Sequence, residues 1–311
     1  MDFRQLRYFA KVAEARSLTR AAESLNIAQP ALSLQMQKLE DEIGQQLLIR
    51  HSRGIELTET GERLLGHARQ IIQQFEIAQR DVREMKGELS GRLRLGMPRG
   101  VAEVFALDLI TAAAEKLPKV AISIVELLGE DINELLVAGR LDLGFSYNVD
   151  DAKRLDCEPL MTERLCFVER AGESAGGREI DFAEAAQQPL ILPAPPRSLR
   201  TQIEEAAQYR GTMLNVVHDV ESLPLLRSMV EAGKGCTILP FSLAEDAIRV
   251  GNLVARPLVQ PEITRRLHIV YPSRPAPSKP HLAIRTMMFD IVRRYAATRA
   301  FGGLIELEIP E

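Results

Sequence analysis

Apolar residues recur at alternating spacings of four and three throughout the segment 58–89, and this regularity constrains the fold more than any other feature of the sequence. The repeated positions are Leu64, Ala68, Ile71, Phe75, Ala78, Val82, Met85 and Leu89. This heptad pattern predicts one helix of about 45 Å with a continuous apolar stripe. Thr58 is the expected N-cap, and Glu59 and Glu62 place negative charge at the positive end of the helix dipole.

The apolar stripe of this helix has two interpretations. The helix could pack on its own domain, or it could pair with the same helix of a second chain. We favour pairing, because the sequence on either side of the helix has its own separate pattern. The stripe therefore predicts a dimer.

The heptad helix also divides the chain. With 311 residues, the chain is too long for one typical domain. We predict an N-terminal domain over residues 1–58, a dimerising linker helix and hinge over 59–90, and a C-terminal domain over 91–311. Gly87, Ser90 and Gly91 loosen the chain after the helix and form the hinge.

The N-terminal segment predicts three short helices followed by a hairpin. The first helix covers residues 3–13, the second follows the N-cap Ser17, and the third begins near Gln29. Leu32, Met36, Leu39 and Ile43 form the inward face of the third helix, which ends at Gly44. The segment 46–57 contains two short apolar runs around a turn at 51–54. This order is typical of a winged helix-turn-helix, which reads DNA with its second helix.

The exposed face of the third helix offers groups that can read bases. Its candidates are Gln29, Pro30, Ala31, Ser33, Leu34 and Gln37. Glutamine can bond adenine edges, and Ala31 and Leu34 can touch thymine methyl groups. The candidates for phosphate contacts are Arg20, Lys38, Arg50 and Arg53. The alternative is an ordinary solvated helix face, and charge does not decide between them, since residues 1–57 carry a net charge of about +1 and the whole chain −4.

The remainder of the chain alternates strands and helices. We predict strands at 92–97, 120–127, 141–147, 164–169, 190–192, 214–218 and 236–239. We predict helices at 101–117, 131–138, 198–209, 222–232 and 279–298. This alternation is typical of an α/β fold with a mostly parallel sheet, and its length is sufficient for two lobes.

In such lobes, ligands bind near the carboxyl ends of strands and the N-termini of helices. This rule selects three loops, whose candidate residues are Pro98, Arg99, Gly100, Val101, Ser146, Tyr147, Glu221, Ser222 and Leu223. Free backbone N–H groups at helix starts, together with Arg99, favour a small anionic metabolite. The alternative is that the arginine is solvated surface charge.

Other classes of protein find little support in the sequence. The five histidines are scattered, and we find no catalytic motif, metal-ligand spacing or phosphate loop, so we expect no enzyme activity, metal or cofactor. Three unpaired cysteines favour buried thiols over a redox sensor. The sequence lacks a secretory signal and an apolar run long enough for a membrane helix, which predicts a cytoplasmic protein without membrane contact.

The segment 17–61 closely resembles the DNA-binding domain of LysR-type transcriptional regulators. The matching residues include Ser17, Leu18, Thr19, Ala21, Ala22, Leu25, the run 29–33, Leu39, Glu40, Arg50, Arg53, Gly54, Leu57, Thr58 and Gly61. The resemblance continues more weakly through 92–97, 138–145 and 221–240, and the runs NIAQPALS and QQLLIRHSRG are similar to the branch of nitrogen assimilation control proteins. Leu34 and Ala28 depart from the pattern, which often has a basic residue and usually a serine at these positions.

The resemblance implies a sequence-specific regulator of transcription. It implies DNA contacts by Ser17, Leu18 and Thr19 and by wing residues Arg50 and Arg53. It implies a C-terminal domain similar to periplasmic solute-binding proteins, with an effector between two lobes, and adds Pro193, Arg197 and Ser198 to the effector site. It further implies a homotetramer on promoter DNA, with RNA polymerase as an additional partner. Activation and repression both stay open, as do the effector's identity and the alternative of control by the regulator's abundance.

Overall fold

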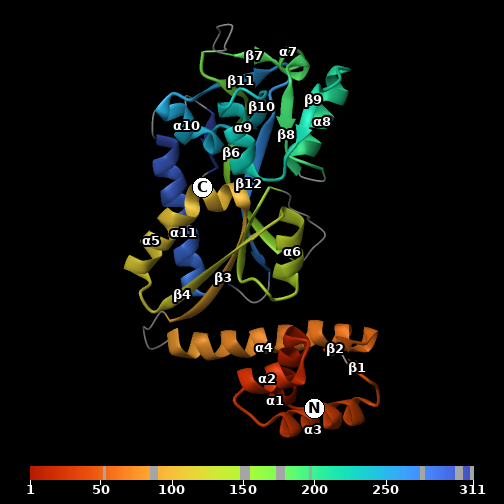
Figure 1. Cartoon of the computed structure of the whole chain (residues 1–311). Helices are drawn as coiled ribbons and strands as arrows, with labels where there is room; N and C mark the ends of the chain where they lie inside the picture. The colour runs from red at the N-terminus through yellow and green to blue at the C-terminus, as the bar shows by residue number, and fades with distance from the viewer. Residues whose placement is uncertain are drawn as a thin grey trace. The chain divides into compact units, whose positions relative to one another are not determined.

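The computed structural model describes residues 1–51, 54–84, 90–147, 155–172, 179–195, 198–273, 277–297 and 304–308. The chain forms two compact units, of which the first comprises Met1–Glu88 with Ala138–Arg140 and the second comprises Leu89–Val137 with Leu141–Glu311 (Figure 1). Among the described helices, none combines the length and the apolar character that crossing a membrane requires.

The first unit contains the predicted helices and hairpin. Its elements are α1 (Phe3–Ala15), α2 (Leu18–Ser24), α3 (Gln29–Ile43), β1 (Leu48–His51), β2 (Gly54–Leu57) and α4 (Glu59–Glu84). Phe9, Leu32 and Leu39 are fully buried where the first three helices meet. The caps agree with the sequence: the Ser17 hydroxyl accepts from the Arg20 N–H, the N-cap residue of α3, Ala28, provides no side-chain cap, and Gly44 ends α3 in the left-handed conformation.

The hairpin packs against the turn between α1 and α2. β1 and β2 pair antiparallel, with Arg50 opposite Ile55. The Ile55 N–H donates to the Arg16 carbonyl at 3.1 Å. Gly54 has φ +139°, and a Cβ there would lie 2.8 Å from the Arg16 oxygen, so both the backbone conformation and the close approach require glycine.

The helix α4 is divided between two environments. Ala68 is fully buried in the core of the first unit, and Leu64 packs on that core. Ile71, Phe75 and Val82 are 43%, 45% and 64% exposed, although the Phe75 ring also lies 4.2 Å from the ring of Phe3. The heptad stripe is therefore covered by the chain's own domain at its start and open farther along. Met85 and Leu89 lie outside the described residues.

The second unit is an α/β domain whose elements alternate as predicted over most of its length. In chain order they are β3 (Gly91–Pro98), α5 (Arg99–Lys116), β4 (Val120–Leu127), α6 (Gly129–Val137), β5 (Leu143–Ser146), β6 (Leu155–Arg170), β7 (Ile180–Asp181), α7 (Phe182–Gln187), β8 (Leu190–Leu192), α8 (Ser198–Arg210), β9 (Val216–Asp219), α9 (Leu223–Glu231), β10 (Thr237–Pro240), η1 (Phe241–Leu243), α10 (Glu245–Val250), β11 (Leu253–Val259), β12 (Thr264–Pro272), α11 (Lys279–Ala297) and β13 (Ile305–Leu307).

The long strand β6 belongs to two lobes. Its residues 155–164 pair with β12, in a sheet of order β4-β3-β5-β12-β6. Its residues 165–170 pair with β10 and β11. We call the part built on β3, β4, β5, β12 and the start of β6 the first lobe, and the part built on β7 to β11 and the end of β6 the second lobe. Figure 1 shows β6 and β12 running between the two.

The expectation of a mostly parallel sheet is wrong. The described pairs β3–β4, β3–β5, β7–β11 and β8–β9 are parallel, but β12 is antiparallel to β5 and β6, and β6 is antiparallel to β10, β11 and β13. Among the strands of these antiparallel pairs, the prediction missed β11, β12, β13 and the first half of β6. In β12 and the first half of β6, charged residues interrupt the apolar alternation and hide the period of a strand.

Candidate DNA interface and effector pocket

The third helix of the first unit presents the predicted reading face. Gln29, Pro30, Ala31, Leu34, Gln37 and Lys38 are exposed, whereas Leu32, Met36 and Leu39 are buried. This division follows from the helical period, which places the two sets on opposite sides of α3. The exposed face combines two glutamine amides with apolar side chains, and both kinds of group can contact base edges in a major groove.

The hairpin is joined to this reading face by a side-chain contact. The Arg50 Nη1 on β1 donates to the Ser33 hydroxyl on α3 at 3.2 Å. The exposed Arg20 donates through Nη2 to the Ala15 carbonyl at 2.7 Å. Thr19 is exposed, while Ser17 and Leu18 are half-buried at the start of α2. Arg53 lies outside the described residues.

A pocket of about 140 Å³ opens in the second unit, where residues of both lobes meet. Its lining residues are Pro98, Arg99, Gly100, Leu127, Leu128, Gly129, Tyr147, Glu163, Pro193, Ser198, Leu199, Glu221, Leu223, Ser242, Leu243 and Arg265. The loops predicted from sequence do converge here. An engineered cavity of about 150 Å³ can hold a benzene ring, so this pocket has room for a small metabolite.

The structure places four candidate residues away from the pocket surface or outside its description. Val101 is 1% exposed and belongs to the core, because it lies on the inward side of α5. Ser146 is fully buried at the end of β5. Ser222 caps α9 by accepting from the Leu225 N–H and does not line the pocket, whereas its neighbours Glu221 and Leu223 do. Arg197 lies outside the described residues.

A buried carboxylate forms part of the pocket floor. Glu163 is 1% exposed and accepts hydrogen bonds from the Tyr147 hydroxyl at 2.7 Å and the Ser242 hydroxyl at 3.0 Å. Burial raises the pKa of Glu163, although nearby Arg265 and the two hydroxyl donors oppose that shift. Burial and then the charge of Glu163 raise the pKa of Tyr147 well above its ordinary value. Tyr147 therefore acts as a hydrogen-bond donor at neutral pH.

A buried guanidinium lies beside this carboxylate. Arg265 is 8% exposed and stands directly opposite Glu163 in the antiparallel pairing of β12 with β6. Its guanidinium carbon lies 3.7 Å from the centre of the Tyr147 ring, and its Nη2 donates to the Ser198 hydroxyl at 3.4 Å. The Nε of Arg265 has no hydrogen-bond partner among the described residues. The pocket thus contains a buried positive group for which the described residues supply one long hydrogen bond.

Sequence reasoning missed Glu163, Arg265 and Ser242, and a usable signal was present for the first two. Arg265 lies two residues from Ile263 and from Leu267, which are both buried, and exposed residues lie between them. Glu163 likewise lies between the buried residues Met161 and Leu165. A charged residue at an inward position of a strand is costly unless it is paired or functional, so each was a candidate.

The mouth of the pocket contains a second, more exposed arginine. Arg99 begins α5, and its Nε lies 3.3 Å from a Glu126 oxygen. Both side chains are about half exposed, at 51% and 52%. Water therefore screens this pair, and Arg99 is a weaker anion partner than the buried Arg265.

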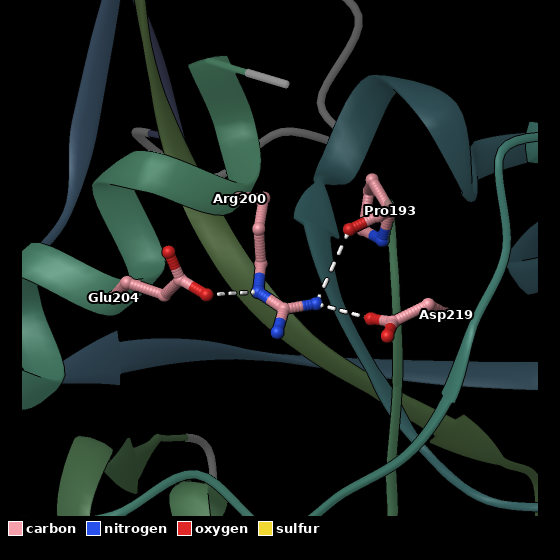
Figure 2. A network of polar contacts seen from close by, with 4 residues as sticks. All are labelled: Pro193, Arg200, Glu204 and Asp219. Carbon is pink, nitrogen blue, oxygen red and sulfur yellow. Dashed lines mark hydrogen bonds and ion pairs between the residues drawn. The ribbon is translucent and has the colours of Figure 1, made fainter. Parts of the chain in front are cut away.

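A polar network supports one wall of the pocket. Arg200 on α8 donates through Nη1 to the Pro193 carbonyl at 3.3 Å and to Asp219, and through Nε to Glu204 at 2.7 Å (Figure 2). Pro193 lines the pocket, and Asp219 ends β9 just before pocket residue Glu221. The Arg200 guanidinium therefore connects the pocket loop at Pro193 to the loop that follows Asp219.

The described cysteines give little support to redox sensing. Cys166 is fully buried, and burial raises its pKa to about 12. Cys236 is also buried, while Cys157 is exposed on β6. A thiol with a raised pKa reacts poorly, since the thiolate is the reactive form.

Comparisons with known proteins agree with the two units. Residues 3–62 match the bacterial regulatory helix-turn-helix protein, lysR family, and residues 86–290 match the LysR substrate binding domain. The nitrogen assimilation regulatory protein nac of Klebsiella aerogenes is 32% identical over 295 residues, which cover 94% of this chain and 96% of that protein. This similarity agrees with the resemblance to the nitrogen assimilation branch.

Solved structures show the same architecture. A full-length OxyR variant from Pseudomonas aeruginosa has a TM-score of 0.77 and 25% identity, covering 94% of this chain and 95% of its own. Full-length CbnR in complex with its target DNA has a TM-score of 0.66 and 25% identity, covering 94% and 99%. The proteins matched are transcription regulators and not enzymes. The chain therefore belongs to the LysR family of DNA-binding transcriptional regulators, with a helix-turn-helix and a LysR substrate-binding domain.

Proposed function

We propose that this LysR-family regulator reads its promoter with α3 and the β1–β2 wing, and that a small organic ligand in the pocket between the lobes adjusts that binding. The observation that carries the proposal is the convergence of both lobes on a pocket whose lining includes a buried guanidinium, that of Arg265. A buried charged group in a concave pocket is a candidate for binding a ligand.

The DNA contacts are assigned to exposed groups. Gln29 and Gln37 would bond base edges, and Pro30, Ala31 and Leu34 would touch thymine methyl groups. Arg20, Lys38 and Arg50 would contact phosphates, with Ser17, Leu18 and Thr19 placing α2 against the backbone. The similarity to CbnR, solved with its target DNA, supports this assignment for the domain as a whole.

Assembly would use the open part of α4. Ile71, Phe75 and Val82 expose apolar surface on a helix whose earlier heptad position Ala68 is already buried in its own domain. Pairing two such helices would cover this surface and place two reading heads on one duplex. We further propose that residues 59–90 act as the linker, that dimers associate into a tetramer, and that the bound assembly contacts RNA polymerase.

Selection of duplexes from a random library by the full chain, followed by footprinting, tests the reading of DNA. We expect a recurring site with two related half-sites. Replacing Gln29 with alanine should reduce discrimination at particular bases by about 1–3 kcal/mol, as for loss of one bidentate contact. An alanine variant with full affinity and full selectivity would remove Gln29 from the reading face.

Control of the regulator by a ligand has a separate test. A ligand that binds the pocket should change the footprint or the bend of the selected duplex. If pocket ligands bind and the DNA complex never changes, regulation by the abundance of the protein becomes the better account.

A further inference from the structure

We propose that the C-terminal part of the chain acts as a clamp that holds the two lobes of the second unit in one relative orientation. The clamp consists of residues 291–297 of α11 and residues 304–308, which include β13. It contacts both strands that pass between the lobes and one helix of the second lobe. The clamp needs no ligand, so the inference does not depend on the proposed function of the pocket.

The clamp lies beyond the part of the domain that the family model describes. The match to the LysR substrate binding domain ends at residue 290. About two turns of α11 and the whole of β13 follow this point. In the second of these segments, Ile305 and Leu307 alternate with Glu306 and Glu308, which is the period of a half-buried strand. The family match therefore does not explain what this structured segment does.

The strand β13 lies along β6 at the place where β6 leaves the first lobe. Ile305 stands opposite Glu163 in this antiparallel pair, and the Arg164 N–H donates to the Leu304 carbonyl at 2.9 Å. The next residue, Leu165, is already the first residue of the second lobe. Leu304 and Ile305 are both buried in the core, which anchors the strand. The pairing therefore fixes β6 directly beside its passage between the lobes.

The Glu308 carboxylate joins the two strands that pass between the lobes. The Thr162 hydroxyl on β6 donates to Glu308 Oε1 at 2.8 Å. The Arg266 Nε on β12 lies 2.9 Å from the same oxygen. Thr162 and Arg266 stand opposite each other in the pairing of β6 with β12. One carboxylate oxygen thus restrains both strands at the same level.

Tyr295 on α11 makes the contact with the second lobe. Its hydroxyl donates to Glu245 Oε2 at 2.8 Å, and Glu245 begins α10, which lies between β10 and β11. The Tyr295 ring packs edge-on against Phe105 of α5 in the first lobe, with ring centroids 5.0 Å apart. Burial, and then the hydrogen bond to Glu245, raise the pKa of Tyr295 above its ordinary value of 10. The hydroxyl therefore stays protonated and keeps donating at neutral pH.

These contacts together oppose rotation of one lobe against the other. A hinge movement changes the backbone angles of a few residues where the connecting strands cross. Here β13 and Glu308 restrain the crossing itself, while Tyr295 bonds the second lobe away from the crossing. Rotation must therefore break contacts at both places. Arg227 on α9 also pairs with Glu103 on α5, and this ion pair between the lobes remains when the clamp is removed, so variants of the clamp should fold.

A distance between spin labels on the two lobes of the full chain tests the proposal. The labels are placed on Glu134→Cys of α6 and Glu184→Cys of α7, two exposed positions, in a Cys157→Ser background. An excess of unlabelled chain limits each assembly to one labelled copy. Double electron–electron resonance should give the parent one narrow distance distribution. Tyr295→Phe combined with Glu308→Ala removes both side-chain contacts of the clamp and should widen that distribution at least about twofold.

Two further proteins assign the effect to the clamp. Tyr209→Phe combined with Glu306→Ala makes the same chemical changes at exposed positions, since Tyr209 is 83% exposed on α8 and Glu306 is exposed on β13. This control should keep the distribution of the parent. A chain that ends after Ala297 lacks β13. It should show a still wider distribution, and its Arg164 amide should exchange at least about tenfold faster.

The variant of Tyr295 and Glu308 decides the outcome, because it keeps every backbone contact of the clamp. The proposal is overturned if this variant keeps the narrow distribution of the parent, or if the control widens it equally. A parent that already samples a wide range of distances would overturn it too. If the chain that ends after Ala297 does not fold, the side-chain variant alone gives the answer. Binding of the selected duplex by the same preparations confirms that the first unit stays folded.

Discussion

At the scale of single residues, Leu34 is notable because it is a large apolar side chain on the exposed face of α3. It is 50% exposed on α3, among polar and small side chains that also face outward. A branched apolar side chain cannot bond a base edge, but it can cover the methyl group of thymine. We infer that it supplies part of the preference for thymine in the half-site.

Replacing each thymine of the selected site with deoxyuridine removes one methyl group at a time. At the position read by Leu34, affinity should fall by about fourfold, since a buried methyl contributes about 0.8 kcal/mol. The Leu34→Ala protein should bind both duplexes alike at that position, as measured by fluorescence anisotropy. Equal sensitivity of parent and variant to deoxyuridine at every position would contradict this role.

Glu163 gives a second prediction at this scale, for stability against pH. Because burial raises its pKa above the ordinary value of 4.5, the folded state holds the proton more tightly than the unfolded state does. The stability that this proton supplies is present below about pH 4.5 and is lost as the pH rises through the raised pKa. Glu163→Gln lacks this titration. Its Tm relative to the parent should therefore be more favourable at about pH 8 than at about pH 5, and thermal unfolding at both values measures the change.

An equal Tm difference at the two pH values would show that Glu163 does not titrate between them. A matched replacement, Glu205→Gln on the outer surface of α8, should leave the pH dependence as in the parent.

At the scale of elements, the apolar stripe of α4 packs on its own domain at one end and is exposed along the rest of its described length. The sequence predicts a single seam, yet Ala68 is buried within its own domain, and the open stripe begins at Ile71. Ile71→Asp combined with Val82→Asp should weaken dimerisation by at least about a hundredfold, because an unpaired charge buried in an interface costs about 3 kcal/mol or more. Sedimentation at several concentrations measures the dissociation.

The control for this pair is Gln74→Asp with Gln79→Asp, which adds the same charge to exposed positions of the same helix. We expect its dimer to be nearly unchanged. A dimer of normal stability in the Ile71 and Val82 variant would place the main interface outside α4.

The Arg200 network is the second element-scale feature with a measurable consequence. Arg200→Met releases the Pro193 carbonyl and Asp219, so the two pocket loops lose their common anchor. Glu204 and Asp219 are about half exposed and stay hydrated, which limits the expected loss of unfolding free energy to about 1–2 kcal/mol. Hydrogen exchange should accelerate in 190–195 and 219–223.

Arg210→Met, on the same helix, removes an arginine that pairs with Asp181 and does not contact these loops. Its exchange in both loops should match the parent. Unchanged exchange in the Arg200→Met protein would show that packing alone holds the loops.

The elements differ in how well a sequence predicts them. Helices such as α5, α8, α9 and α11 were predicted to within about two residues, because their caps and apolar periods are local signals. The strands β11 and β12 and the start of β6 were missed. Their stability comes from partners far along the chain, and inward charges such as Glu163 and Arg265 break their alternation. The loops of the pocket could be predicted because they follow strands and helices with local signals. Glu163 and Arg265 could not, because they lie on the strands that were missed.

At the scale of the whole molecule, the effect of a ligand on DNA affinity and the effect of DNA on ligand affinity must be equal. If a pocket ligand changes the affinity for the selected duplex by a given factor, the duplex changes the affinity for the ligand by that same factor. A tenfold effect corresponds to about 1.4 kcal/mol. Titrating a pocket ligand with and without saturating duplex, and the duplex with and without that ligand, should return one coupling factor. Two unequal factors would indicate a change in oligomeric state during the measurement.

The passage of β6 from one lobe to the other has a consequence for recombination between relatives. The second lobe is one uninterrupted stretch of chain, from Leu165 to about Glu262. Its two ends are neighbours: the Leu165 N–H donates to the Ile263 carbonyl at 2.9 Å, and Arg164 pairs with Glu262 at 2.9 Å. Insertions with adjacent ends are well tolerated by folded proteins. Two crossovers, one at each of these points, would exchange the part of the pocket wall that includes Pro193, Ser198 and Leu223. Arg265, Tyr147 and the helix α3 would stay with the recipient.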